Sequence, residues 1–68
     1  MEITINGAPH KLSSGSTLLA VLDALNIEHD RQGIAIAVGM SVIPRSLWAQ
    51  TVLNQGDRVE VVTAAQGG

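Results

Sequence analysis

One segment of this chain has the spacing of an amphipathic helix, and the segments on both sides of it have the alternation of strands. Its apolar positions recur at i, i+3, i+4 and i+7, and they are Leu18, Val21, Leu22 and Leu25. This spacing predicts a helix over about residues 17–26, with Ser16 as its N-cap and Asn26 as its stop. A chain of 68 residues supports only one hydrophobic core, so the apolar face of this helix must be buried against a sheet.

The flanking segments alternate between apolar and polar residues, as half-buried strands do. Strands are predicted over residues 1–6, 8–12, 34–38, 41–43 and 58–63. Asn6-Gly7 predicts a type I′ hairpin turn between the first two strands, and Gly39-Met40 predicts a type II′ turn between the next two. Because proline cannot donate to a sheet ladder, Pro9 predicts that the second strand lies at an edge.

The order of elements is hairpin, helix, hairpin, a short turn capped by Ser46, and a final strand. This order predicts an α+β fold of the β-grasp (ubiquitin-like) type, in which a mixed sheet of four to five strands packs on one helix. A right-handed crossover through the helix would bring the first and last strands side by side and parallel at the centre. We expect residues 1–63 to form this domain and residues 64–68 to form a flexible C-terminal tail ending in Gly-Gly.

Composition argues against several classes of function. Cysteine is absent, which removes disulfides, thiolate metal sites and cysteine nucleophiles. The four basic residues are scattered, so no cluster could neutralise the phosphates of a nucleic acid. His10 and His29 have no second ligand at metal-binding spacing, and we expect no metal site and no cofactor. Without an apolar run of about 20 residues or a signal peptide, a cytoplasmic protein with no membrane association is expected.

The diglycine Gly67-Gly68 is the first candidate functional site. Because glycine has no Cβ, such a tail can thread a narrow channel in a partner enzyme. The Gly68 carboxylate, delivered to the α-phosphate of ATP, would become an acyl adenylate, and sulfur transfer onto its carbonyl would leave a thiocarboxylate. We expect covalent modification at Gly68 and partner contacts at Gln66 and Gly67. The alternative is a frayed terminus without function.

The outer face of the predicted sheet is the second candidate site. Ala35 and Ala37 occupy strand positions where alternation usually brings polar residues, and Val62 is predicted to share their face. We predict that these three residues bind a partner.

The sequence allows two interpretations of the role of Trp48 and two of the role of Arg45. Trp48, the only aromatic residue of the Phe, Tyr and Trp class, could be a binding hot spot or could close one end of the core. Arg45 could pair with an acidic partner surface or be a solvated surface arginine.

Over nearly its whole length the chain resembles the family of thiamine-biosynthesis sulfur carrier proteins. The most specific mark of this resemblance is the Pro-Arg-Ser-x-Trp stretch at residues 44–48, which follows Val42-Ile43. Gly56-Asp57 and the final diglycine also resemble the family. The second hairpin departs from it, with Gly39-Met40 in place of the Asn-Gly turn that is common there.

The resemblance implies a specific set of partners. An ATP-dependent adenylating enzyme would activate Gly68, a cysteine-desulfurase pathway would supply sulfur, and thiazole synthase would receive it for the thiamine thiazole ring. The carrier would be a substrate of these enzymes and not an enzyme itself. A molybdopterin-synthase-type sulfur carrier and a ubiquitin-like protein modifier share the fold and the diglycine, and they remain alternatives. A structural module that uses only the sheet face is a third.

Overall fold

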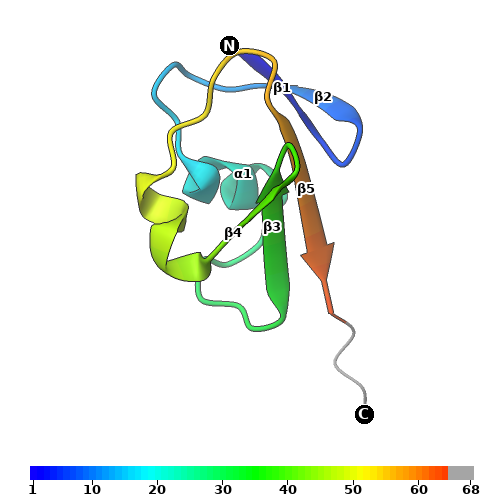
Figure 1. Cartoon of the computed structure of the whole chain (residues 1–68), viewed down its shortest axis with the longest axis vertical. Coiled ribbons are helices and arrows are strands. Elements are labelled where there is room, and N and C mark those ends of the chain that lie inside the picture. The colour runs from blue at the N-terminus through cyan, green and yellow to red at the C-terminus, as the bar shows by residue number, and fades with distance from the viewer. Residues whose placement is uncertain (65–68) are drawn as a thin grey trace.

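The computed structural model, which describes residues 1–64, has one mixed sheet with an α-helix and a 3-10 helix on the same side of it (Figure 1). The elements in chain order are β1 (Glu2–Ile5), β2 (Ala8–Lys11), α1 (Leu18–Ala24), β3 (Ile34–Val38), β4 (Ser41–Ile43), the 3-10 helix η1 (Arg45–Gln50) and β5 (Arg58–Thr63). The five strands lie in the order β2-β1-β5-β3-β4. The predicted β-grasp fold is confirmed.

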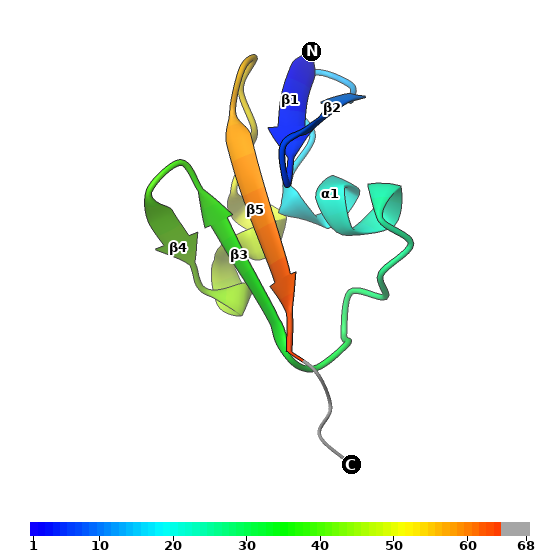
Figure 2. The same ribbon diagram turned by 90° about the vertical axis from the view of Figure 1, so that its right-hand side faces the viewer.

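The central pair of strands has the predicted geometry. β1 and β5 are parallel neighbours, and the remaining pairs in the sheet are antiparallel (Figure 2). A parallel pair needs a crossover connection, and α1 lies within the long segment that joins the two strands. β2, which contains Pro9, is an edge strand as predicted. The end of β5 therefore leaves the domain from the middle of the sheet.

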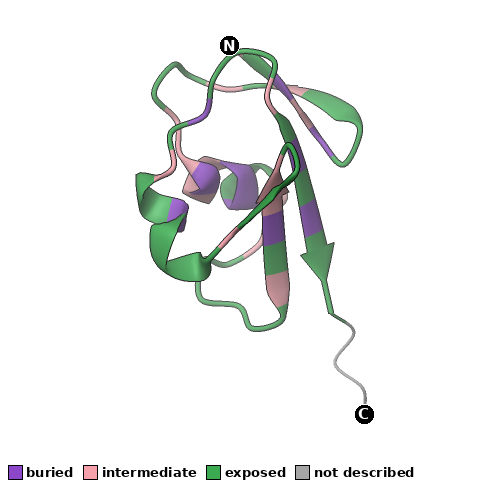
Figure 3. Ribbon diagram, in the orientation of Figure 1, coloured by how far each residue is buried: buried purple, intermediate pink, exposed green. Residues whose placement is uncertain are grey.

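Alternate strand residues and one stripe of α1 form the core, as the buried segments in Figure 3 show. The buried residues are Ile3, Ile5, Leu18, Val21, Leu22, Ile36, Trp48, Leu53, Val59 and Val61. Full burial of an aliphatic side chain contributes about 1.5–3 kcal/mol, and aliphatic residues make up nearly all of this set. Since the helix side of the sheet is used for this core, the opposite side is left uncovered.

The start of α1 differs from the prediction. Thr17 is the N-cap, because its hydroxyl oxygen accepts the amide of Leu19 at 3.3 Å. The hydroxyl of Ser16 instead donates to the carbonyl oxygen of Ser13 at 2.7 Å, so the prediction of Ser16 as N-cap is wrong. The helix ends where predicted, since Asn26 has a φ of 58°, the left-handed conformation that follows many helices.

Both hairpin turns have the predicted types. Asn6 and Gly7 have φ values of 52° and 84°, and a type I′ turn needs positive φ at both central residues. Gly39 has a φ of 61°, whereas Met40 is not in the positive-φ region, which is the pattern of a type II′ turn. The departure from the family's Asn-Gly turn thus still gives a two-residue hairpin loop.

The short turn after β4 is the six-residue 3-10 helix η1. It begins at Arg45, directly after Pro44, and no side chain caps it, so the prediction of Ser46 as its cap is wrong. Trp48 is 2% exposed, and its indole Nε1 donates to the carbonyl oxygen of Ile43 at 2.8 Å. Of the two readings of Trp48, the structure supports closure of the core.

Arg45 has a structural role that neither reading of the sequence included. Its guanidinium lies 4.4 Å from the centre of the Trp48 ring, within the range of a cation–π interaction. The same group donates to the backbone carbonyl oxygens of His29 and Arg31. Arg45 therefore ties the loop that precedes β3 to η1.

Candidate functional site

The predicted chemical site follows β5, the central strand of the sheet. Ala64, the last described residue, is still hydrogen-bonded to the residue that precedes β3, because its amide donates to the carbonyl oxygen of Gly33 at 2.7 Å. Three of the predicted site residues lie outside the described residues, and they are Gln66, Gly67 and Gly68. Their roles, and the tail predicted over residues 64–68, stay predictions.

The three residues predicted on the outer face are brought together by the pairing of β3 with β5. Ala35 lies opposite Val62, and residues directly opposite each other in a sheet share one face. Ala37 lies two residues along β3 and so faces the same way. Ala35 is exposed, Ala37 is half-buried, and Val62 is 61% exposed. The predicted placement of the three residues on one face is confirmed, and the predicted binding of a partner stays a prediction.

Two further apolar residues extend this face, and the sequence interpretation missed them. Val42 lies opposite Ala37 across the β3–β4 pair and is 74% exposed, and Met40, at the hairpin tip, is fully exposed. The position of Val42 on this face could have been predicted from the sequence. A two-residue turn at Gly39-Met40 sets the register of this hairpin, so residue 42 must lie opposite residue 37. We refer to Ala35, Ala37, Met40, Val42 and Val62 as the sheet-face patch.

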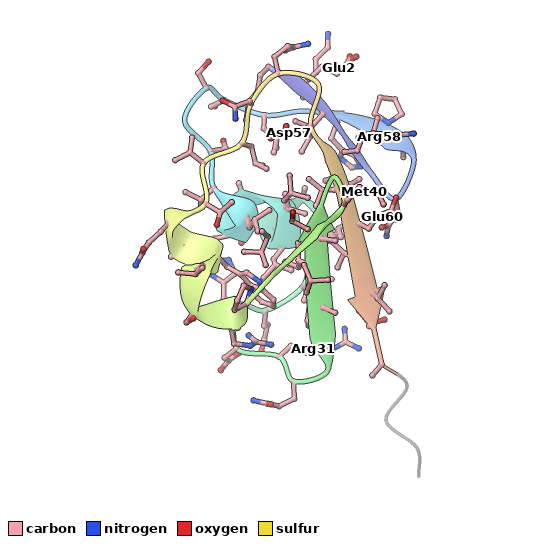
Figure 4. All side chains as sticks on the ribbon, viewed as in Figure 1. Glu2, Arg31, Met40, Asp57, Arg58 and Glu60 are labelled. Atoms are coloured by element: carbon pink, nitrogen blue, oxygen red, sulfur yellow. The ribbon has the colours of Figure 1, made fainter. Side chains whose placement is uncertain are left out.

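Charged side chains of β5 border the sheet-face patch, with Glu60 directly opposite Ala37 and Arg58 two residues before it on the same face. Arg58 and Glu60 on β5 line an open hollow of about 290 Å³ together with Gly39 and Met40. Figure 4 labels Met40, Arg58 and Glu60 around this region. A surface with an apolar centre and charged residues of both signs at its border has the composition of a protein-binding face.

The described residues contain no arrangement typical of a metal site. In residues 1–64, no three side chains of His, Asp or Glu come together in a way that could hold a metal ion. His29 forms a pair with Asp23 at the surface, with 2.7 Å between Nε2 and Oδ1. Within the same range, none of the helices has the length and apolar content needed to cross a membrane.

Comparison with known proteins identifies relatives that match the whole chain. The sulfur carrier protein ThiS of Escherichia coli is 28% identical over 68 residues, which is all of both chains. The uncharacterized protein ycf40 of Porphyra purpurea is 34% identical, and the alignment covers 93% of it. A thiazole synthase of Paramagnetospirillum magneticum is 32% identical, and the chain spans 20% of the length of that protein.

Solved structures confirm the fold. The crystal structure of the thiamine biosynthesis protein ThiS from Geobacter metallireducens aligns over all of both chains with a TM-score of 0.79 and 24% identity. A solution structure of a thiamine biosynthesis protein from the same organism aligns over 88% of its length with a TM-score of 0.77. At this identity the likeness is evidence for the β-grasp fold alone.

The family assignment comes from the sequence. Residues 3–68 match the ThiS family, so the match includes the strands, the Pro-Arg-Ser-x-Trp stretch at residues 44–48 and the diglycine. The resemblance to thiamine-biosynthesis sulfur carriers is thereby confirmed, and the family supports the prediction of a carrier in place of an enzyme. This chain belongs to the ThiS family.

Proposed function

We propose that this protein carries sulfur for thiamine biosynthesis as a thiocarboxylate on Gly68. The observation that carries the proposal is the ThiS family match, because it extends through the diglycine at residues 67–68. The alignment with the E. coli sulfur carrier protein, which covers all of both chains, supports the same role. The protein acts as a substrate of its partner enzymes.

The proposed chemistry has two steps at the Gly68 carboxylate. A carboxylate oxygen attacks the α-phosphorus of ATP, the bond to the β-phosphate oxygen breaks, and an acyl adenylate and pyrophosphate are formed. Hydrosulfide, released when a thiol reduces the S–S bond of a persulfide donor, then attacks the carbonyl carbon and loses its proton, AMP leaves with the electrons of its bond to that carbon, and a thiocarboxylate remains. In a chain with no cysteine, this gives a covalent site for sulfur.

The proposed partners follow from this chemistry and from the relatives. Segments similar to the whole chain occur within two proteins named thiazole synthase, each of which the chain covers for 20% of its length. This supports a thiazole synthase as the enzyme that accepts the sulfur. An ATP-dependent adenylating enzyme is proposed for the first step and a cysteine-desulfurase pathway for the sulfur supply. An ATP-dependent step also favours the cytoplasm as the compartment.

We propose the sheet-face patch as the surface that docks the adenylating enzyme. The patch includes Val62, the second-last residue of β5, so an enzyme that covers the patch lies close to Ala64, the last residue before the segment that ends in the diglycine. Contact with the patch and delivery of Gly68 are therefore parts of one binding event.

The test is ATP–pyrophosphate exchange by the adenylating enzyme in the presence of the protein. We expect exchange with the full chain and none with a variant lacking Gly68, because adenylation requires reacting atoms about 3–3.5 Å apart and one extended residue spans about the same distance. Exchange at the same rate with the shortened variant would refute Gly68 as the site. Hydrogen exchange of the backbone amides is the control for folding, and the core amides of the shortened variant should be as protected as those of the full chain.

A further inference from the structure

β5 continues beyond the point where β1 can pair with it. The in-register backbone pairing of the two strands ends at Val59, whereas β5 runs to Thr63. Up to that point, alternate residues from Asp57, directly before β5, to Val59 accept amides from the β1 side. The carbonyl oxygen of Asp57 accepts the amide of Thr4 at 3.0 Å. The carbonyl oxygen of Val59 accepts the amide of Asn6 at 2.9 Å.

Val61 is the next residue whose backbone faces this side, because backbone groups alternate along a strand. β1 has ended there, and the chain turns away at Asn6-Gly7. The side chain of Asn6 fills the missing position. Its Oδ1 accepts the amide of Val61 at 2.7 Å, and its Nδ2 donates to the carbonyl oxygen of Val61 at 3.1 Å. One side-chain amide thus continues the sheet by one residue.

Beyond Val61, the described part of the strand is held by its pairing on the β3 side alone. The residues that follow, Val62, Thr63 and Ala64, are exposed, so packing contributes little to their position. On the β3 side they are paired, with Ala64 donating to Gly33 at 2.7 Å. On the β1 side, the Asn6 amide is the last hydrogen-bonding group that the described residues show against β5.

We propose that Asn6 is a positioning residue for sulfur loading, because its side chain holds β5 at Val61 and so fixes the end of the strand from which the chain continues to the diglycine at residues 67–68. The inference rests on the proposed function of Gly68. A strand that is hydrogen-bonded on one side only opens at a lower free-energy cost than one bonded on both sides. Misplacement of a reacting group by about 1 Å can lower a rate by about 100-fold.

The chain offers a matched pair of substitutions. Asn6→Gly keeps the positive φ of the turn and removes only the side-chain amide. Asn26→Gly is the control, since Asn26 has a similar φ of 58° at the end of α1. Asn6→Asp is a second test variant that does not introduce glycine. It keeps an acceptor for the Val61 amide and places a carboxylate oxygen against the Val61 carbonyl.

The first measurement, hydrogen exchange of single backbone amides, is independent of function. In the Asn6→Gly protein, we expect the Val61 amide to exchange about tenfold faster than in the unmodified protein, with Val59 little changed. The second is steady-state adenylation by the activating enzyme. We expect kcat to fall about tenfold with KM for the carrier within about twofold, because the sheet-face patch is intact. Asn26→Gly should match the unmodified protein in both measurements.

Each outcome has one meaning. If Asn6→Gly is adenylated with the unmodified kcat, or if Asn26→Gly loses as much, the positioning role is wrong while the proposed function stands. A rise in KM with unchanged kcat also overturns it, since that pattern indicates weaker docking. If the unmodified protein is not adenylated, the proposed function fails and the loading role of Asn6 fails with it. If Asn6→Gly does not fold, the same comparison is made with Asn6→Asp.

Discussion

Substitution of Val42 by aspartate tests the sheet-face patch at a residue that is distant from the end of β5. Full burial of a valine contributes about 1.5–3 kcal/mol, and Val42 is 74% exposed in the free protein, so about 1–2 kcal/mol remains to be gained when a partner covers it. Removing a carboxylate from water without a partner adds about 1–3 kcal/mol or more to the cost. We therefore expect Val42→Asp to weaken binding of the adenylating enzyme by at least about 2 kcal/mol, or about 30-fold in Kd.

The assay is calorimetric titration of the adenylating enzyme with each carrier variant. Val52→Asp is the matched control, because Val52 is 54% exposed and pairs with Thr17 next to α1, away from the uncovered side of the sheet. It should bind within about twofold of the unmodified protein, since surface substitutions away from an interface change free energies by about 0.5 kcal/mol or less. Equal Kd values for Val42→Asp and the unmodified protein, with both folded, would refute the docking surface. Equal weakening by the two substitutions would show a nonspecific effect of charge.

Two further predictions concern the fold that presents the site. Arg45→Ala should lower the free energy of unfolding by about 1–3 kcal/mol, because it removes hydrogen bonds to two backbone carbonyls and the contact with Trp48. Urea denaturation measures this loss, and an unchanged midpoint would contradict the role of Arg45 in tying the loop before β3. Trp48→Ala should cost about 3–5 kcal/mol, because the side chain is buried and hydrogen-bonded. A loss below about 1 kcal/mol in the same experiment would be inconsistent with closure of the core by Trp48.

The parts of the fold that depend on local pattern were predictable from the sequence. β4 has the predicted bounds because a glycine at position 39 and Pro44 limit it on both sides. The Asn6-Gly7 turn was predictable because few other residue pairs accept positive φ twice. The burial alternation of β5, with Val59 and Val61 inward, follows from the period of two in a strand.

The errors concern choices that local pattern does not decide. Ser16 and Thr17 are adjacent hydroxyl residues, and either could cap a helix. The structure decides between them through the hydrogen bond from Ser16 to Ser13. Arg45 contacts backbone 14 and 16 residues away, and no spacing rule within one element predicts such a contact.

For the candidate site, the sequence predicted the chemistry at Gly68 and part of the sheet face. It did not predict the role of Asn6 beyond its turn. That role depends on β1 and β5 being neighbours, with a sequence separation of 55 between Asn6 and Val61. Such a contact becomes visible only when the register of the parallel pair is known.

The most direct test of the central claim is the chemical state of Gly68 in protein isolated from cells that make it. Intact-mass analysis should show a fraction of molecules in which one oxygen is replaced by sulfur, and fragmentation should assign the change to Gly68. Because oxidation of Met40 or Trp48 adds a similar mass, treatment with a reagent that alkylates thiocarboxylates must shift the same fraction. We expect an alkylated Gly68 that disappears in cells lacking the adenylating enzyme. An unmodified Gly68 under active thiamine synthesis, or a Gly68 joined through an amide bond to lysines of other proteins, would contradict it.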